Sequence, residues 1–265
     1  MTDPDVARAV AINVAANTTL PGVRGPIYPD GSFLYVPIPE REPTVERVPT
    51  YAALGFDDDL PTGLPDEAVD RRVHFDPEFA GYYGHERYTY GDEHGVKAGP
   101  LSRLEPGDSL VFYATLRTES FRDTPARTTA GTTADPGDPV GWRPPDWGAY
   151  AIGAFRVARV VTPEDDRDPP AWAASNAHCR RETFDAEVLV RGTDDSRLFE
   201  RAVPLSDPAG GASANVLVTE LSNDSGRGPW WRRVLRFDAD ETARLRRAFE
   251  TAPDDWLDDL AALHE

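Results

Sequence analysis

Apolar positions along the chain fall into short runs that are separated by turn-rich segments. The runs at 10–15 and 33–38 predict two strands, and Pro37 in the second requires an edge or a bulge there. The clearest runs are 109–116, which follows a Pro-Gly-Asp turn, and 147–161. We expect these two segments to be neighbouring strands of one sheet.

Helical patterns are concentrated toward the end of the chain. Residues 172–179 predict a short helix, while 240–249 and 253–263 predict two amphipathic helices, the first with Asp240 as its N-cap. The order of elements lacks the regular strand–helix alternation of a parallel sheet. It therefore predicts an α+β fold with a curved, mainly antiparallel sheet or a partly closed barrel, and with peripheral helices.

The same pattern predicts one domain over residues 1–240, with the helices of 240–265 packed on it. Residues 118–146 are rich in Thr, Pro, Gly and Asp. Because matching strands flank this segment, we expect a mobile surface loop within the domain and not a linker between domains.

Composition narrows the class of protein. The chain has 265 residues, 40% of them hydrophobic, which suffices for a sizeable core. No apolar run is long enough to span a membrane, and the acidic first residues lack the features of a signal peptide. We expect a cytoplasmic protein without a membrane partner. The single cysteine, Cys179, excludes an intramolecular disulfide and a cysteine-rich zinc site.

The net charge is −18, from 46 acidic and 28 basic residues, and Lys97 is the one lysine. This balance predicts adaptation to a high-salt, halophilic cytoplasm, the alternative being a preference for cationic partners. Net acidity does not exclude a nucleic acid here. At high salt, counterion release contributes little to binding, so contacts with bases are favoured over contacts with phosphates.

No established catalytic motif is present, so candidate chemistry rests on spacing. His74 and Asp76 lie two positions apart, which places both side chains on one face of an extended segment. Such a pair could bind a metal or act as a general base with its orienting carboxylate. The alternative is an Asx-turn at Asp76 before Pro77, with His74 on the surface.

Aromatic and arginine-bearing segments suggest a planar ligand. The turn before 109–116 and the Ile-Gly-x-Phe pattern of the following strand resemble small barrels of the PUA type, which hold bases in aromatic pockets. Tyr113 would then supply a stacking face, and His178, Arg197 and Trp231 lie in segments that combine arginine with polar or aromatic residues. The alternative is that the aromatic rings are core and the arginines are solvated.

Ten short motifs, in shared order over about residues 10–240, resemble the family called nucleotide modification associated domain 3. They are 13–17, 24–27, 30–31, 36–40, 74–77, 88–92, 104–108, 150–155, 176–178 and 196–198. The resemblance implies an α+β domain associated with systems that modify bases in DNA. The polar motif positions that it carries over are Arg24, Asp30, Glu40, His74, Asp76 and Asp92.

These observations together give the candidate site. The predicted catalytic residues are His74, Asp76, Asp30, Glu40 and Asp92. The predicted ligand-binding residues are Arg24, Asn13, Asn17, Tyr113, His178, Arg197 and Trp231. The sequence identifies no cofactor and leaves a divalent metal open.

Two hypotheses from different classes follow. The first is an enzyme of nucleotide or DNA-base modification, and the second is a non-catalytic reader of modified bases. A structural partner in a DNA-modification or defence complex is a third. An enzyme requires the polar residues of the N-terminal third to meet in one cleft, with Arg24 on an anion, whereas a reader requires an open aromatic pocket.

Overall fold

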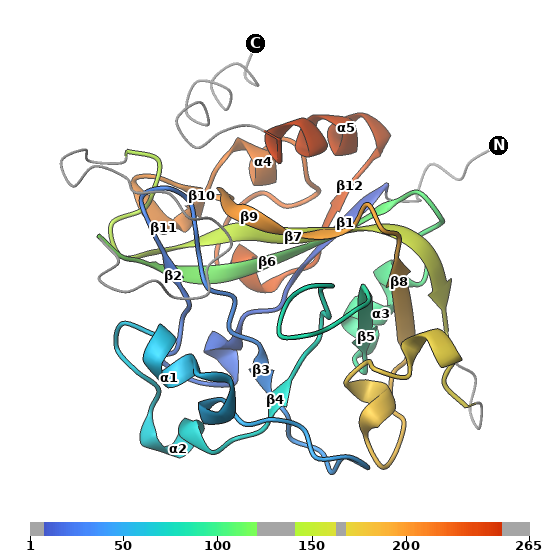
Figure 1. Ribbon diagram of the computed structural model, residues 1–265. Coiled ribbons are helices and arrows are strands. Elements are labelled where there is room, and N and C mark those ends of the chain that lie inside the picture. The colour runs from blue at the N-terminus through green and yellow to red at the C-terminus, as the bar shows by residue number, and fades with distance from the viewer. Residues whose placement is uncertain (1–7, 121–140, 163–167, 251–265) are drawn as a thin grey trace.

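Two long strands form the centre of the computed structural model, which describes residues 8–120, 141–162 and 168–250 (Figure 1). The strands are β1 (Ala9–Asn13), β2 (Pro26–Ile27), β3 (Ile38–Pro39), β4 (Val73–His74), β5 (Thr89–Asp92), β6 (Ser109–Thr118), β7 (Trp147–Val161), β8 (Val188–Gly192), β9 (Arg197–Pro204), β10 (Ser206–Asp207), β11 (Gly210–Ala214) and β12 (Leu235–Phe237). The helices are α1 (Phe56–Asp59), α2 (Asp66–Val69), α3 (Gly95–Leu101), α4 (Val216–Thr219) and α5 (Ala239–Ala248).

The predicted neighbours, β6 and β7, pair antiparallel along almost their whole length. The main sheet has eight strands in the order β12-β1-β6-β7-β8-β5, with β2 paired to β6 and β9 to β7. Its β1–β6 and β2–β6 pairs are parallel and its other pairs are antiparallel. The α+β class is thus confirmed, and the sheet is mixed.

The closed form of the predicted barrel is not confirmed. Within the described residues the sheet is open, with β12 at one end and β5 at the other. Strand β7 is bent, since β9 pairs with its residues 150–154 and β8 pairs with 157–161 (Figure 1). The bend turns β8 and β5 away from the plane of β6 and places β5 near β4 instead of beside β12.

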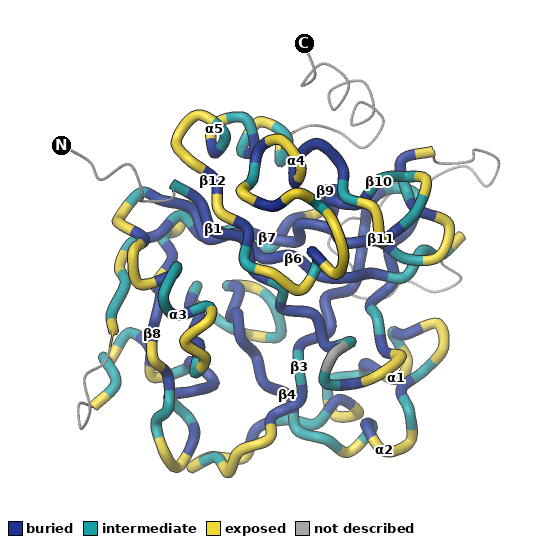
Figure 2. The backbone as a smooth tube through the Cα atoms, turned by 180° about the vertical axis from the view of Figure 1, so that it is seen from behind, coloured by how far each residue is buried: buried dark blue, intermediate teal, exposed yellow. Residues whose placement is uncertain are grey.

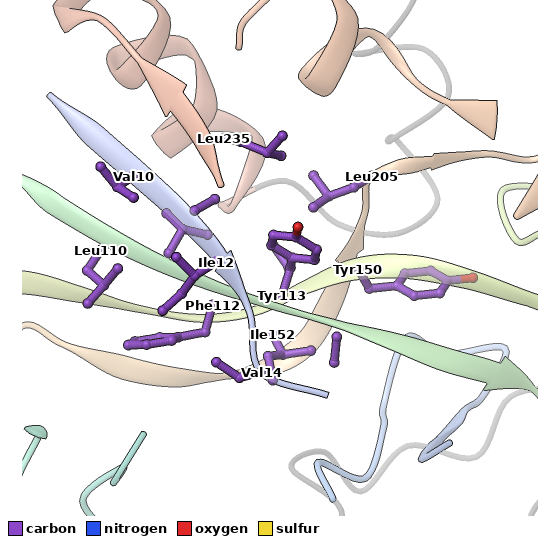
Figure 3. Packing of buried hydrophobic residues seen from close by; sticks show 14 of the residues in the cluster. Val10, Ile12, Val14, Leu110, Phe112, Tyr113, Tyr150, Ile152, Leu205 and Leu235 are labelled. Atoms are coloured by element: carbon purple, nitrogen blue, oxygen red, sulfur yellow. The ribbon is translucent and has the colours of Figure 1, made fainter. Parts of the chain in front are cut away.

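The two faces of the sheet carry different layers. Tyr113 lies near Leu205 and Leu235 on the face toward α4 and α5, whereas Phe112 lies on the opposite face (Figure 3). There Phe112 contacts Phe79 and Phe155 edge to face. Alternation along β6 therefore buries aromatic rings on both sides of the sheet.

The predicted strand at 33–38 is wrong, because only Ile38 belongs to a strand. Phe33 and Tyr35 pack into the main core, whereas Leu34 and Val36 pack into a second core beneath the sheet. Because the segment is buried on both sides, its residues form a continuous apolar run, which in the sequence looks like a buried strand. It runs between two cores without a ladder partner for most of its length.

The C-terminal helix α5 begins earlier than predicted, because a different residue is its N-cap. Asp238, and not Asp240, accepts hydrogen bonds from the backbone at the start of α5. The helix packs on the domain, because Arg246 donates to Ser109 Oγ at 2.7 Å and Leu245 is buried in the main core. The predicted helix at 253–263 and most of the predicted loop at 118–146 lie outside the described residues.

The predicted helix at 172–179 is instead two short 3-10 turns, Ala171–Ala173 and His178–Arg180. Figure 2 shows the buried backbone continuing from the sheet through β4, with exposed residues on the outer loops. No helix in the described part of the chain is long and apolar enough to cross a membrane.

Candidate functional site

A cluster of buried ionisable groups lies below the bent end of the sheet. Strands β3 and β4 pair antiparallel with Ile38 opposite His74, which brings Glu40 back alongside the histidine. Glu40 Oε2 lies 2.6 Å from His74 Nδ1, and both side chains are 2% exposed. The β3–β4 register therefore fixes the orientation of the His74 ring.

Asp76 occupies the centre of the cluster. Its carboxylate accepts hydrogen bonds from the backbone N–H of Gly91 at 2.9 and 3.1 Å and from Asn176 Nδ2 at 3.2 Å. Its Oδ2 lies 3.3 Å from His178 Nε2 and 3.9 Å from His74 Nε2. Two imidazoles from distant segments thus face one carboxylate oxygen.

The turn at 176–181 supplies the third side of the cluster. Asn176 Oδ1 accepts from the backbone N–H of His178 at 3.1 Å, and His178 Nδ1 lies 2.8 Å from Asp185. Arg181 is bonded to Glu40 at 3.1 Å and also forms ion pairs with Glu93 and Asp185. The arginine therefore links the carboxylates behind both histidines.

Gly91 allows these segments to approach closely. A Cβ atom at this position would lie 2.8 Å from His178 Cδ2 and 3.0 Å from Asn176 Oδ1. Real Cβ contacts are longer, so any larger residue would push the turn away from β5. The glycine is required here by space and not by its backbone conformation.

Electrostatics keep a proton in this cluster. Burial lowers the pKa of His178, but hydrogen bonds to Asp185 and Asp76 outweigh it and raise the pKa to about 9. Burial raises the pKa of Asp76, and its bonds with His178 and Gly91 oppose that shift without reversing it. At neutral pH the His178–Asp76 pair therefore holds a proton.

Glu40 and Asp185, the carboxylates bonded to the Nδ1 atoms of the two histidines, have lowered pKa values. Burial raises the pKa of Glu40, but the hydrogen bond to His74 and the charges of His74 and Arg181 outweigh it and lower the pKa to about 2. Burial likewise opposes ionisation of Asp185, yet its bond with His178 lowers its pKa well below the usual range. Since both carboxylates are ionised, each histidine must donate its Nδ1–H outward.

A further carboxylate, that of Asp92, lies on strand β5. Asp92 accepts from the Tyr90 hydroxyl at 2.6 Å and lies 3.2 Å from Lys97 Nζ on α3. It also accepts from the backbone N–H of His94 at 2.8 Å, which holds the chain where α3 begins. The single lysine of the chain is thereby fixed beside the cluster.

A pocket of about 290 Å³ opens onto these groups. It is lined by Asn13, Val14, Ala15, Thr19, Ile38, His74, Asp76, Tyr90, Gly91, Asp92, Glu93, His94, Lys97, His178, Arg181 and Arg232. A neighbouring depression shares Asn13, Lys97 and Arg232 and continues to Arg233 and Arg236. The pocket thus has buried acid–base groups within it and basic side chains at its edge.

The structure brings together six of the residues selected from the sequence. His74, Asp76, Asp92, His178 and Asn13 line the pocket, and Glu40 supports His74 from behind. Asn13 is already bonded at both ends of its amide, to the Trp231 carbonyl at 2.6 Å and the Ala15 N–H at 2.8 Å. It therefore positions the backbone beside Arg232.

Arg24 and Asp30, which were expected to join this group, lie elsewhere. The Arg24 guanidinium stacks 4.9 Å from the Trp147 ring. Asp30 accepts from the N–H and the hydroxyl of Ser32 at 2.9 and 2.6 Å, so it holds its own turn. Neither residue lines the pocket.

The aromatic candidates are also outside the pocket. Tyr113 is fully buried and donates to the Arg233 carbonyl at 2.5 Å, so no ring face is open to a ligand. Trp231 is half-buried against Trp147. Exposed Arg197 lies over the Phe199 ring, 5.7 Å from its centre.

Asn17 lies in a 3-10 turn beyond the pocket lining. Its Oδ1 is buried and has no hydrogen-bond partner among the described residues. Burial and then the Asp76 charge raise the pKa of the Cys179 thiol to about 12, which does not favour a thiolate nucleophile at neutral pH.

Sequence reasoning missed several members of the site. Asn176 and Tyr90 lie inside the motifs 176–178 and 88–92, and Arg181 lies just beyond the first, but none was selected as a site residue. Asn176 carried a usable signal, because it belongs to the same short motif as His178. Lys97 carried another, since it is the one lysine among 28 basic residues.

Comparison with known proteins gives one match. The family model described as nucleotide modification associated domain 3 matches residues 8–247. The comparisons with curated proteins and with solved structures found no match. The matched range includes every residue of the ionisable cluster.

Proposed function

The chain belongs to the nucleotide modification associated domain 3 family, and on that premise we propose that it is an enzyme acting on a nucleotide or an extruded DNA base. The reacting group would enter the pocket and meet His74, Asp76 and His178. The coarser role, association with nucleotide modification, follows from the family itself.

One observation carries the enzymatic proposal. Three buried, ionisable side chains from separate segments converge where a pocket ends, and two of them hold a proton that is available near neutral pH. Groups with shifted pKa values inside a cleft are typical of acid–base catalysis. His178 Nε2 would deliver or accept the proton, and Asp76 would stabilise the charged imidazole.

Basic groups at the pocket edge support a phosphorylated substrate. Lys97 and Arg232 line the pocket, and Arg236 lies in the neighbouring depression. In a chain of net charge −18, these side chains gather basic groups at one edge, where Lys97 is paired with Asp92 and the two arginines add further positive charge. A phosphate would bind at this edge while the base points inward.

The reader hypothesis has less support. It requires an open aromatic pocket, but the sheet aromatics Phe112, Tyr113, Tyr150 and Phe155 are fully buried. Among the described residues, Tyr90 is the one Phe, Tyr or Trp that lines the pocket, and its hydroxyl donates to Asp92. Partner proteins of a DNA-modification system remain compatible with either role.

Mass spectrometry of nucleosides tests the proposal. We expect deletion of the gene to remove a modified nucleoside from its host, and the wild-type chain to restore it. Asp76→Ala and His178→Ala should fail to restore it, whereas Arg197→Ala, which changes an exposed residue away from the pocket, should succeed.

Analysing hydrolysed DNA and the free nucleotide pool separately distinguishes the two substrate sources. An unchanged nucleoside profile after deletion, with the protein verified as folded and expressed beforehand, would contradict an enzymatic role. Binding to modified oligonucleotides without such a change would favour the reader.

A further inference from the structure

Three side chains of the cluster have the arrangement of a metal site. We propose that His74 Nε2, Asp76 Oδ2 and His178 Nε2 bind one divalent first-row transition-metal ion. Donor atoms of these three residues lie within 4.8 Å of one another, and all three side chains are buried. The inference deepens the proposed function and rests on it for its catalytic meaning. The ion would lie where the substrate reacts and would take the place of the proton on His178 Nε2, because one nitrogen cannot hold both.

The orientation of the two imidazoles is the first argument. Glu40 and Asp185 accept the Nδ1–H groups of His74 and His178, at 2.6 and 2.8 Å. Metal-binding histidines commonly donate their other ring N–H to a carboxylate, which fixes the tautomer and makes Nε2 the ligand. Both Nε2 atoms here face the same oxygen of Asp76.

The distances already approach those of a coordinated ion. Metal–ligand bonds of 2.0–2.1 Å at tetrahedral angles place neighbouring donor atoms about 3.3 Å apart. The His178–Asp76 separation is 3.3 Å and the His74–Asp76 separation is 3.9 Å. The donor atoms of all three residues lie within 4.8 Å of one another, so small side-chain shifts would bring them to one ion.

Charge is the third argument. Glu40, Asp76, Glu93 and Asp185 supply four carboxylates, and Arg181 supplies one positive charge among them. Once the ion has displaced the His178 proton and both imidazoles are neutral, these groups carry three uncompensated negative charges. Glu40 and Asp76 are buried, and Glu93 and Asp185 are partly exposed. A divalent cation beside Asp76 would balance most of that excess.

A second group of possible ligands is already satisfied. Glu93, His178 and Asp185 also lie within reach of one another. However, the Arg181 guanidinium forms ion pairs with both of these carboxylates. A metal ion there would have to displace the arginine, so the His74–Asp76–His178 group is the site.

Ligand type selects the class of ion. Two imidazole nitrogens and one carboxylate oxygen favour Zn²⁺, Fe²⁺ or Co²⁺, whereas Mg²⁺ and Ca²⁺ require oxygen ligands. Three protein ligands leave coordination positions open for water or substrate, as in catalytic sites. Those positions face the pocket, because all three residues line it.

Metal titration of the full-length wild-type chain tests the inference without a nucleotide. After treatment with a chelator, we expect one Co²⁺ per chain, with the visible absorption of nitrogen- and oxygen-bound cobalt. Zn²⁺ should displace it, and a large excess of Mg²⁺ should not. Absence of stoichiometric Co²⁺ and Zn²⁺ binding by the folded wild-type chain would overturn the proposal.

Variants locate the ion. His74→Ala or His178→Ala should weaken binding by roughly 100-fold or more, and Glu40→Gln by about 10–100-fold. His94→Ala is the matched control, because His94 lines the same pocket but its side chain is 71% exposed. Binding lost in His94→Ala and retained in folded His178→Ala would also overturn the proposal.

Failure here is separable from failure of the proposed function. A chain that binds no metal yet still changes the nucleoside profile of its host uses the cluster for proton transfer alone. A chain that binds metal without changing that profile has a metal site of another role.

Discussion

The sheet interior around Phe155 and the cluster around His178 are about equally hidden from solvent, yet they are built from opposite chemistries. Phe155 is surrounded by Phe79, Phe112 and Tyr88 in edge-to-face contacts. His178 is surrounded by carboxylates and an arginine. Burying the rings stabilises the fold, whereas burying the charges costs free energy unless every one of them is paired.

This difference separates what the fold needs from what the function needs. Replacing a buried ion cluster with apolar residues is often neutral or stabilising, so folding alone does not explain why a protein maintains one. The close packing of His178 and Asn176 against Gly91 and the hydrogen bond from Asn176 to Asp76 hold the cluster in one geometry. Such positioning is expected where chemistry takes place.

The strongest test of the comparison removes an aromatic ring from the sheet. Phe155→Ala should lower the free energy of unfolding by about 3–5 kcal/mol, because the variant loses apolar burial and leaves a cavity. Urea unfolding followed by tryptophan fluorescence measures it. Val96→Ala is the control, because Val96 is 81% exposed. Equal stability of the two variants would refute a packing role for the ring.

The second test breaks the ion cluster from one side. Arg181→Met should lower the free energy of unfolding by about 3 kcal/mol, because it leaves buried Glu40 without its cationic partner. Arg180→Met should change it by less than about 0.5 kcal/mol, since Arg180 pairs with exposed Glu46.

Adding Glu40→Gln to Arg181→Met sharpens this result. The double variant should be more stable than the sum of the single losses predicts, because the unpaired buried charge is gone. Strict additivity of the two losses would show that these side chains do not interact.

The third and smallest expected effect is a dependence on pH. The pKa of His178 rises from 6.5 in the unfolded chain to about 9 in the folded one. Its contribution to stability is therefore complete below pH 6.5 and is lost as the pH rises through 9. In chelated protein we expect the free energy of unfolding to fall by roughly 1–3 kcal/mol over this interval.

Denaturation curves at several pH values measure this slope, and His178→Gln is the comparison. The variant cannot hold the proton, so its stability should be nearly flat over the same interval. A wild-type curve that is equally flat would mean that the pair with Asp76 holds no extra proton.

Local patterns in the sequence were sufficient for part of the fold. Strands β6 and β7 stood out because long apolar runs follow a tight turn, and α5 because its apolar face repeats with helical spacing. The parallel pairing of β1 with β6 left no local signal, since it joins residues about 100 positions apart. An open sheet could not be distinguished from a barrel for the same reason.

The candidate site was only partly accessible from sequence. The spacing of His74 and Asp76 pointed to chemistry, and family motifs added Glu40 and Asp92. Arg24 and Asp30 came from those motifs as well, but a long-range contact of Arg24 with Trp147 and a local bond of Asp30 with Ser32 hold them elsewhere. Asp92 reaches the site on β5, which pairs with β8, and β8 pairs in turn with the bent end of β7; no short motif encodes that bend.

The distance along the chain between the halves of the cluster has a consequence for how the protein matures. Asn176 and Asp76 are 100 positions apart, so their contact closes a very long loop, and we expect it to form after β7 and β8 have paired. We therefore expect a partly folded chain to have no working site. The ionisable groups of the cluster would then be assembled last.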